Sequence, residues 1–552
     1  MDVKTLTFES VPEYRHLEGA PVAFFCAEYA FDEDSSMYAG GLGVLAGDFI
    51  LESADEGIPF VAIGLWYGGS TSSARAKGFT LVEKDGVHIL IEVPCGEEIV
   101  KARVWAHRFG KSAYLLLLDT NILENSPDNQ VITERLYDSN LETRLKQGLL
   151  LGIGGVRLLS QLGITPSIYH LNEGHTAFAG FELIVESMAN DGAGDVESAL
   201  ASVKEKVVAT KHTIFSIAGF SMDEDKFVLL VGPYCQKNNI PVRDIFKLGK
   251  DKNVEKMFST TQFLLNCAHR QNGVSILHTT FEKLAHPDSI LFPITNGVHQ
   301  KRWQAEAWHS SLPSETRPTN ETMWEIKHNL RKRLVDFVAI KTGVRLDPDA
   351  CTIVWARRFT KYKRPELLFS DPPRLKKICA QSAKVQFIIA GEAHASDVAG
   401  QKMVDEIKTI TKDPIFNNRI VYLEDYSVTV AVELVLGADV WLNTPERGFE
   451  ACGTSGMKAG LNGALEASVS DGWIDEVDWS NIGFILSEDD TARSVYDTIE
   501  KEIIPLFYRR ESGGLPLEWI RRMRDTQSIV ESGFTAKRML HDYLARAYVI
   551  PK

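Results

Sequence analysis

The sequence predicts an α/β protein with two Rossmann-like domains that face a cleft, and three observations support this fold class. Short apolar runs recur, each followed by a glycine or polar turn, as in "VAFFCAEYA" and "CTIVWARR". Helical patterns such as "TRLKQGLLLGIGGVRLLSQLG" separate these runs. The 552 residues exceed what one hydrophobic core usually serves. Buried strands that alternate with helices favour parallel sheets, whose functional groups lie at the carboxyl ends of the strands.

A change in residue composition between residues 300 and 348 divides the chain. This segment, which begins "QKRWQAEAWHSSLPSETRPTNETMWEIKHNLRKRL", is polar and helical and precedes the strand "CTIVWA". We therefore expect an N-terminal Rossmann-like domain that binds glucan and phosphate over residues 1–300. A C-terminal Rossmann-like domain that binds the cofactor is expected over residues 301–525. Amphipathic helical sequence fills the tail, and the helix of residues 526–552 is expected to pack back on the first domain.

Composition and charge limit the classes of function. Hydrophobic residues make up 44% and charged residues 24% of the chain, as in ordinary globular proteins. The net charge of −14 argues against a general nucleic-acid or anionic-membrane surface. The start lacks a secretory pattern, and no apolar stretch reaches the length of a membrane span. Seven scattered cysteines without Cys-x-x-Cys spacing indicate reduced thiols in a cytoplasm and no zinc site.

A glycine turn at "YAGGLGVLAGD" is the first candidate site, with Gly40 and Gly41 before a helical run. Backbone N–H groups at the start of a helix can bind an anion. A tight turn between strand and helix is the commoner explanation of such a pattern, so the motif alone does not decide between them.

A cluster of cations follows the apolar run "CTIVWA", in "WARRFTKYKRPELL". Arg358 and Lys363 belong to it, and a cluster of this kind is unusual in an acidic protein. At the carboxyl end of a strand it can clamp an anion, because arginine forks match phosphate oxygens. A solvated charged loop is the alternative, and the structured turn that the neighbouring strand indicates favours the clamp.

Histidines beside glycine, asparagine or threonine form a third group. His175 lies in "LNEGH", His269 in "CAHRQNG", and a further histidine in "ATKHTIF" receives no assigned role. Asn296 lies in "TNGVH", where it is placed to bond a ligand. Metal-binding His-Glu-x-x-His spacing is absent, so zinc is not expected. Isolated histidines are more often structural than catalytic.

Lys458 stands among small residues in "EACGTSGMKAGLNGALEASVSDGWIDE". A lysine there can be a salt-bridge partner, a phosphate ligand or a covalent anchor. A desolvated lysine near other cations has a lowered pKa and forms imines readily. Simple exposure at a helix start is the alternative, which the surrounding "GTSG" and "LNGAL" make less attractive.

Six motifs in this order resemble the α-glucan phosphorylases, the family of glycogen, starch and maltodextrin phosphorylases. They are "GGLGVLAGD", "LNEGH", "NGV", "RRFTKYKR", "LEDY" and "EACGTSGMKAGLNGAL", and the likeness covers nearly the whole chain. The resemblance is to a short prokaryotic-type member without an N-terminal regulatory extension. It implies the glycosyltransferase B fold and pyridoxal 5'-phosphate bound as a Schiff base to one lysine.

The resemblance also implies roles for single residues. Lys458 matches the lysine that holds the cofactor. The other cofactor-binding residues implied are Gly40, Gly41, Lys363, Tyr426, Gly453 and Thr454. The substrate-binding residues implied are Arg358 for phosphate, His269 near the sugar 6-hydroxyl, Glu450 for sugar hydroxyls, and His175, Asn296, Cys452 and Gly453. The catalytic set implied is Lys458, Arg358, Lys363, His269 and Glu450, with no metal.

The activity that the resemblance implies is reversible phosphorolysis of α-1,4-glucan or maltodextrin by inorganic phosphate, giving α-D-glucose 1-phosphate with retention. The resemblance also implies that the cofactor phosphate would share a proton with the substrate phosphate, which in turn would protonate the glycosidic oxygen. Cationic groups must offset the repulsion between two phosphates in a dry cleft. Such an enzyme of glycogen degradation is expected in the cytoplasm, and the habit of the family implies a homodimer.

Two departures from the family pattern leave alternatives open. Cys452 stands where serine is usual, and Glu392 stands where many relatives carry lysine. A retaining nucleotide-sugar glucosyltransferase on the same fold is the second hypothesis, and a catalytically weak glucan-binding paralogue is the third. Lys458 speaks against a synthase, which has no use for a Schiff-base lysine.

Overall fold

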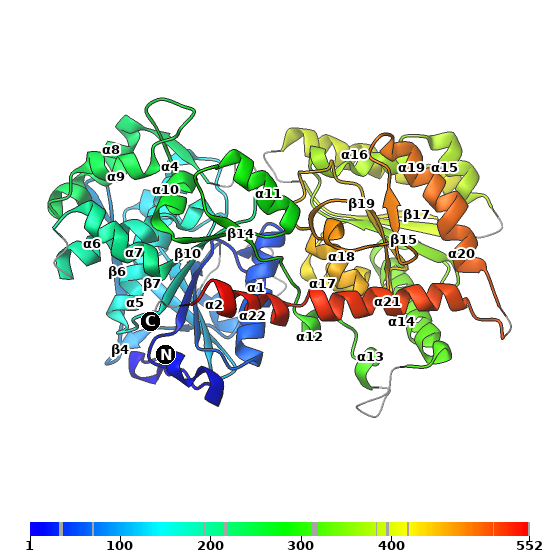
Figure 1. The fold of residues 1–552 in the computed structure, drawn as a ribbon, viewed down its shortest axis with the longest axis horizontal. Helices are drawn as coiled ribbons and strands as arrows, with labels where there is room; N and C mark the ends of the chain where they lie inside the picture. The colour runs from blue at the N-terminus through cyan, green and yellow to red at the C-terminus, as the bar shows by residue number, and fades with distance from the viewer. Residues whose placement is uncertain are drawn as a thin grey trace. The chain divides into compact units, whose positions relative to one another are not determined.

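A computed structural model describes most of the chain, in two compact units. The described residues are 1–31, 37–68, 71–190, 194–213, 219–310, 318–381, 384–393, 397–416, 419–511 and 513–549. Unit 1 comprises Met1–Val274, Thr279–Ile294 and Leu540–Lys552, and unit 2 comprises Ser275–His278 and Thr295–Met539. Figure 1 shows strands framed by helices in both units, so the prediction of an α/β protein is confirmed.

Unit 1 is built on a 10-stranded sheet in the order β14-β13-β10-β9-β1-β2-β8-β7-β3, with β6 beside β7. All pairs from β14 to β8 are parallel, and the pairs that β7 makes are antiparallel. The sequence analysis did not foresee this antiparallel edge. The strands are β1 Val22–Phe25, β2 Phe60–Leu65, β3 Thr80–Leu81, β6 Leu90–Cys95, β7 Glu98–Phe109, β8 Ala113–Asp119, β9 Ile168–Asn172, β10 Val207–Lys211, β13 Arg270–Gly273 and β14 Leu291–Pro293.

Unit 2 contains a 6-stranded sheet, parallel throughout, in the order β17-β16-β15-β18-β19-β20. This is the strand order of Rossmann-type folds, in which the chain starts at the centre and reverses beside its first strand. The strands are β15 Cys351–Ala356, β16 Val385–Ala390, β17 Ile420–Leu423, β18 Val440–Asn443, β19 Leu465–Val469 and β20 Phe484–Leu486. Every residue of β15 and β16 is buried, as expected for strands covered on both faces.

Helices connect the parallel strands of both units. In unit 1 they include α1 Gly41–Asp55, α4 Leu141–Leu149, α5 Gly155–Gln161, α6 Phe178–Asn190, α7 Val196–Lys206, α8 Glu224–Lys237, α9 Val242–Gly249 and α10 Thr260–Cys267. In unit 2 they include α14 Asn320–Thr342, α15 Pro372–Cys379, α16 Val398–Thr411, α17 Val428–Gly437, α18 Thr454–Gly460, α19 Thr491–Thr498 and α21 Leu517–Gly533. The last helix, α22, spans Ala536–Arg546.

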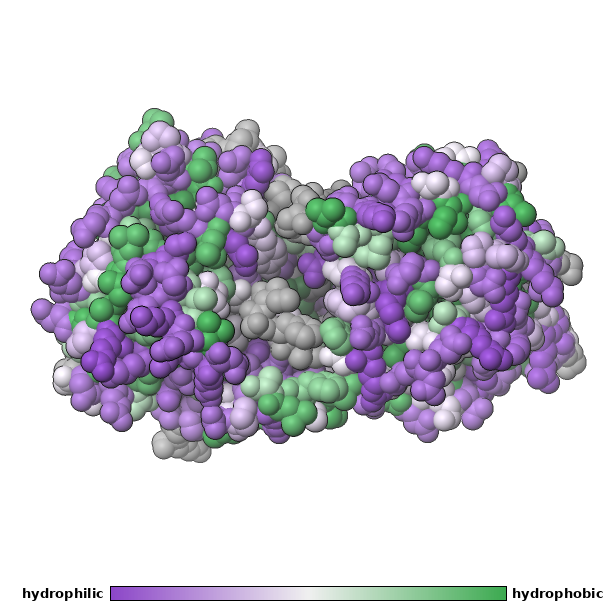
Figure 2. All heavy atoms as spheres, turned by 90° about the horizontal axis from the view of Figure 1, so that it is seen from above, coloured by the Kyte–Doolittle hydropathy of each residue, from purple (hydrophilic) through white to green (hydrophobic). Residues whose placement is uncertain are grey.

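Hydrophilic side chains cover most of the face drawn in Figure 2, with apolar residues between them. Single exposed apolar side chains of this kind are normal on globular proteins. Among the described residues, none of the helices combines the length and the apolar character needed to cross a membrane.

A buried ion pair joins the longest helix of unit 2 to its sheet. Arg331 of α14 donates from Nη1 to Oδ1 of Asp439 at 2.8 Å, and both side chains are almost fully buried. The other oxygen of Asp439 accepts the N–H of Thr352 in β15 at 2.8 Å. One carboxylate thus connects α14, β15 and the start of β18.

We predict that Asp439→Ala lowers the free energy of unfolding by about 3–5 kcal/mol, because it leaves the Arg331 charge buried without its partner. Denaturant unfolding followed by tryptophan fluorescence measures the loss. The matched control is Glu433→Ala, which breaks the ion pair of Glu433 with Arg333 of α14. The Arg333 side chain is 56% exposed, so its charge stays in contact with water and the loss should be about 1 kcal/mol or less. Equal losses in the two variants would contradict the role given to the buried pair.

Candidate active site

The reversal of strand order in unit 2 lies between β15 and β18, which are neighbours in the sheet. The loops that leave the carboxyl ends of these strands turn to opposite sides, which opens a crevice where ligands bind in open α/β sheets. One loop carries the cations of "RRFTKYKR", and the other runs through "TPERGFEACGTSG" to α18. Topology therefore brings together two motifs that lie about ninety residues apart in the sequence.

Two cations of the first loop, Arg357, which is buried, and Lys363, which is largely buried, share one carboxylate of the second loop. The Nη2 atom of Arg357 lies 3.1 Å from Oε2 of Glu450, and Nζ of Lys363 lies 3.6 Å from the same oxygen. Burial acts to raise the pKa of Glu450, but Arg357 and Lys363 outweigh it and lower the pKa. Burial, reinforced by the Arg357 charge, lowers the pKa of Lys363 to about 7. One carboxylate faces two cationic side chains, so the cluster favours a further anion.

Asp471 fixes the loop that carries Glu450. Its Oδ2 atom accepts the N–H of Glu450 at 2.9 Å and that of Gly448 at 3.0 Å, and its Oδ1 accepts the N–H of Gly472. Burial raises the pKa of Asp471 to about 7. The sequence analysis missed this residue, which makes no contact of its own with the cations but positions the carboxylate that does.

The segment after Glu450 forms the short helix α18, which carries Lys458. Gly453 precedes the helix with φ of 82°, in the left-handed region that favours glycine, and Thr454 is the first helical residue. Lys458 is 7% exposed, and its Nζ lies 4.2 Å from the centroid of the Trp303 ring. A cation over an indole face is held electrostatically. The alternative of a lysine simply exposed at a helix start is therefore excluded.

Several polar atoms around this cluster are buried but have no hydrogen-bond partner among the described residues. They include Nε and Nη1 of Arg357 and both carboxylate oxygens of Glu466 in β19. A buried donor without a partner costs about 1–3 kcal/mol, and more when charged. Such atoms fit a polar ligand that supplies the missing partners, and a phosphate group has the acceptor oxygens that the guanidinium needs.

Arg358 and Tyr426 lie nearer to solvent than Arg357 does. The side chain of Arg358 is exposed, and Tyr426 is partly buried at the loop after β17. The backbone N–H of Tyr426 donates to Oε1 of Glu392 at 3.1 Å. The carboxylate of Glu392 is thus turned toward the Tyr426 loop. Of the two adjacent arginines, it is Arg357 that contacts Glu450.

Backbone contacts hold the remaining unit 2 residues of the expected site. Cys452 is buried, and its carbonyl accepts the N–H of Trp473 at 3.0 Å. The carbonyl of Asn296 accepts a bond from Arg538 at 3.1 Å, and its side-chain Oδ1 is buried without a partner among the described residues. Asn296 therefore has an amide oxygen able to accept a bond from a ligand.

Unit 1 has its own reversal of strand order, between β1 and β9, and Gly40 and Gly41 lie in the loop and helix that follow β1. The N–H groups of Gly40 and Ala39 donate to Oε2 of Glu28 at 3.2 and 2.7 Å. Oε1 of Glu28 accepts the hydroxyl of Tyr137 at 2.7 Å. Within this unit, the N–H groups of the glycine turn thus already bond an oxygen of a protein side chain, that of Glu28.

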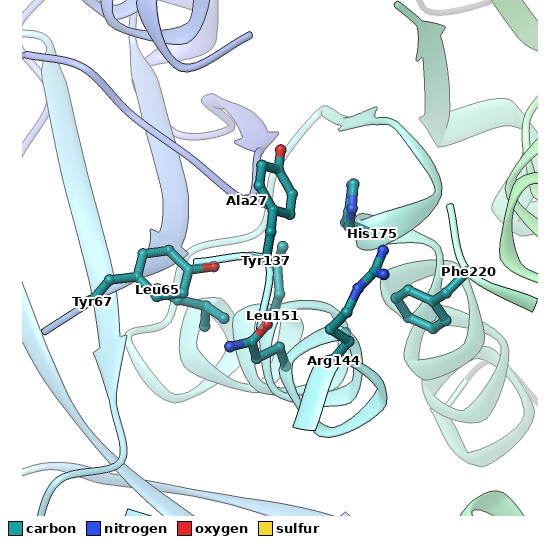
Figure 3. Close-up of a pocket in the computed structure, with 10 residues that line it drawn as sticks. Ala27, Leu65, Tyr67, Tyr137, Arg144, Leu151, His175 and Phe220 are labelled. Atoms are coloured by element: carbon teal, nitrogen blue, oxygen red, sulfur yellow. The ribbon is translucent and has the colours of Figure 1, made fainter. Parts of the chain in front are cut away.

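A pocket beside this reversal contains His175 (Figure 3). Its lining residues are Ala27, Leu65, Tyr67, Tyr137, Arg144, Gln147, Gly148, Leu151, His175 and Phe220. Burial, with a smaller contribution from Arg144, lowers the pKa of His175 to about 4, so its imidazole is neutral at pH 7. Its Nδ1 atom is shielded and has no partner among the described residues. Aromatic faces and directed polar groups are typical of ligand pockets.

His269 does not join these residues. It is exposed and precedes the amino end of β13, at the opposite edge from the carboxyl ends of the strands. His212 instead follows the carboxyl end of β10, where its ring bonds Oδ1 of Asn172 at 3.1 Å and its N–H donates to Glu173 at 2.5 Å. Burial lowers the pKa of His212 to about 3 and raises that of Glu173 to about 8.

The sequence analysis did not select His212 and Glu173. The position after an apolar run would have been the signal, because "KVVATKHT" places His212 at a strand end whereas His269 comes before a strand. Glu173 adopts φ of 64°, an uncommon conformation for glutamate. Such strain is concentrated at functional sites.

Comparisons with known proteins agree with this geometry. A family model described as carbohydrate phosphorylase matches residues 311–480. A glycogen phosphorylase of Aquifex aeolicus is 33% identical over 97% of this chain and 87% of the relative. A maltodextrin phosphorylase of Thermococcus litoralis is 33% identical over 96% of this chain and 70% of the relative. An uncharacterized protein of Methanocaldococcus jannaschii is 28% identical over 96% of this chain and 99% of the relative.

We predict that Lys363 makes the protein more stable as pH rises from 7 to 9. Its pKa is lowered from 10.5 to about 7, so in this range the unfolded chain binds a proton that the folded protein does not. The free energy of unfolding of the wild type, relative to Lys363→Met, should rise by about 1.4 kcal/mol per pH unit at most. Thermal unfolding across this range measures the difference.

The matched control is Lys361→Met, because Lys361 is an exposed lysine of the same turn. The difference in free energy of unfolding between Lys361→Met and the wild type should stay constant over this pH range. A constant difference for Lys363→Met as well would show that Lys363 keeps its proton in the folded protein.

Proposed function

The chain belongs to the family of carbohydrate phosphorylases, and we propose that it is an α-1,4-glucan phosphorylase. The reaction is reversible phosphorolysis at the non-reducing end of glycogen, starch or maltodextrin, which gives α-D-glucose 1-phosphate with retention. One observation supports the proposal most directly: Arg357 and Lys363 share a single carboxylate at the strand-order reversal, and Arg357 retains donors that have no partner in the part of the chain that the structure describes. Such a cluster suits a phosphate substrate.

Pyridoxal 5'-phosphate fits the described residues as the cofactor. Lys458 would hold it covalently, since its ammonium lies shielded over the Trp303 ring at the end of a glycine-rich turn. Arg357 would bind its phosphate together with the residues of unit 2 assigned to the cofactor by resemblance, which are Lys363, Tyr426, Gly453 and Thr454. The resemblance also assigns Gly40 and Gly41 of unit 1 to the cofactor, but within that unit their turn bonds the carboxyl group of Glu28. When bound, the cofactor supplies a phosphate group that can exchange a proton with the substrate phosphate.

The protein residues have to hold two phosphates close together. Repulsion between like charges is strong where water is excluded, and buried cations offset it. Arg357 and Lys363 supply buried charge, and the exposed guanidinium of Arg358 is left for the phosphate that enters from solvent. Neighbouring phosphates would also restore the proton of Lys363, because an anion raises a lysine pKa.

Glu450 and His175 are the residues that we assign to the sugar. Glu450 stays ionised, so its oxygens accept hydrogen bonds. Sugar hydroxyl groups can donate such bonds. His175 is neutral and can accept at one ring nitrogen and donate at the other. The proposed roles of Asn296, Cys452 and His269 rest on family resemblance, and for His269 the place before β13 gives no support. A homodimer and a cytoplasmic location stay predictions.

We predict that the purified protein releases phosphate from α-D-glucose 1-phosphate when a short maltodextrin primer is present. Arg358→Met should lower this rate at least tenfold and keep the bound cofactor, because the proposal assigns Arg358 to the incoming phosphate alone. Phosphate release and cofactor absorbance are measured on the same samples. UDP-glucose and ADP-glucose, run beside them, should give no chain extension. Extension from either nucleotide sugar alone would instead support a nucleotide-sugar glucosyltransferase.

We predict that borohydride reduction attaches the cofactor to the peptide that contains Lys458, as detected by mass spectrometry. Lys458→Met should abolish this attachment and the near-ultraviolet absorbance. The control is Lys361→Met, which removes a solvent-exposed lysine of the same unit and should keep both signals. Wild-type protein that stays colourless when pyridoxal phosphate is added would argue for a glucan-binding paralogue without catalysis.

A further inference from the structure

Glu466 is a buried acid that no step above uses. It lies in β19, pairs in register with Trp441 of β18, and is fully buried. Both of its carboxylate oxygens lack a hydrogen-bond partner among the described residues. A buried carboxyl group without partners is costly, and native proteins keep one mainly where a ligand or a function requires it.

The carboxyl group lies against the first turn of α18. A Cβ atom added at Gly456 would come within 2.7 Å and 2.8 Å of the two oxygens of Glu466. Glycine at this position therefore leaves the space that the Glu466 side chain occupies. Gly456 is two residues from Lys458, so Glu466 reaches the same turn that presents the cofactor lysine.

Burial and one nearby charge act on the pKa of Glu466 in opposite directions. Burial raises its pKa to about 8, and the guanidinium of Arg357 opposes this rise. Gly456 lies against the carboxyl group and Gly483 lies beside the backbone and Cβ of Glu466, and neither glycine brings a charge to it. Arg357 and Glu466 thus influence one another, yet Nε and Nη1 of Arg357 make no bond to the carboxyl group.

A ligand that satisfies both groups must accept from a guanidinium and also accept from a carboxylic acid. A phosphate group does both, because its oxygens bear several lone pairs. An ionised Glu466 would instead repel it. We propose that Glu466 carries a proton and donates it as a hydrogen bond to the phosphate group of the pyridoxal phosphate held by Lys458. This inference rests on the function proposed above and assigns Glu466 as a positioning residue of the cofactor site.

The proposal predicts that cofactor affinity falls at high pH because Glu466 loses its proton. Cofactor-free protein is titrated with pyridoxal phosphate, followed by absorbance, between pH 6.5 and 9.5. The wild-type Kd should rise up to about tenfold per pH unit above pH 8, in excess of the rise in Glu466→Gln. The glutamine variant keeps an N–H donor of similar size and cannot ionise. The ratio of the two Kd values removes the pH dependence of the cofactor itself and of Asp471.

The matched control is Glu488→Gln, which removes an exposed carboxylate of the same unit, paired with Arg447, and should follow the wild type. Parallel curves for the wild type and Glu466→Gln would overturn the assignment of Glu466 and leave the phosphorylase function intact. Failure of the wild type to bind the cofactor at any pH would overturn both.

A second measurement covers the case that Glu466→Gln does not fold, as judged by circular dichroism. The phosphorus NMR signal of the cofactor bound to wild-type protein should shift with a midpoint between pH 7 and 9, as the neighbouring acid ionises. A signal that stays constant over this range would overturn the proposal.

Discussion

Two cations that are buried against a single carboxylate impose the main constraint on unit 2. Removing Arg357 and Lys363 from water costs several kcal/mol for each ion, and Glu450 returns only part of this. The protein meets the cost in two ways. It releases the proton of Lys363 readily, and it fixes Glu450 through the backbone bonds to Asp471. The chain as a whole carries a net charge of −14, so the excess of positive charge at this site is local and opposite in sign to that of the protein.

Both units place their polar groups by the same topological rule, yet the chemistry differs. In unit 1 the loops after β1, β9 and β10 present Glu28, Glu173 and His212. Burial keeps His212 neutral at pH 7, so it can exchange hydrogen bonds without bringing a charge. In unit 2 the loops after β15 and β18 present cations and one ionised acid. The first set has the donors and acceptors that hydroxyl groups need, and the second has the charge that phosphate needs. Reversal of strand order fixes where ligands bind, and the loop residues decide which ligand.

The sequence allowed the parallel strands to be predicted well, because fully buried strands read as continuous apolar runs, as in "CTIVWA". The site was harder to predict in detail. Arg357 and Arg358 are adjacent, and periodicity ends where the strand ends, so nothing in the sequence says which one turns inward. Glu466 stands inside the strand "LEASV", and its relation to Gly456 exists only after folding. The antiparallel strands around β7 follow one another without a connecting helix, so the pattern of alternating strands and helices did not predict them.

The two departures from the family pattern fall where the structure uses backbone more than side chain. The carbonyl of Cys452 accepts a bond from Trp473, and Gly472 adopts φ of 57° beside it, where an added Cβ would lie 2.3 Å from that carbonyl oxygen. This close approach constrains the path of the Cys452 backbone. The contact is made by the carbonyl group and does not involve the thiol. Glu392 likewise accepts the N–H of Tyr426, so its carboxylate supports a loop of unit 2. Neither substitution touches the pair of cations on Glu450, and a cluster whose geometry rests on backbone bonds tolerates such changes without losing its charge.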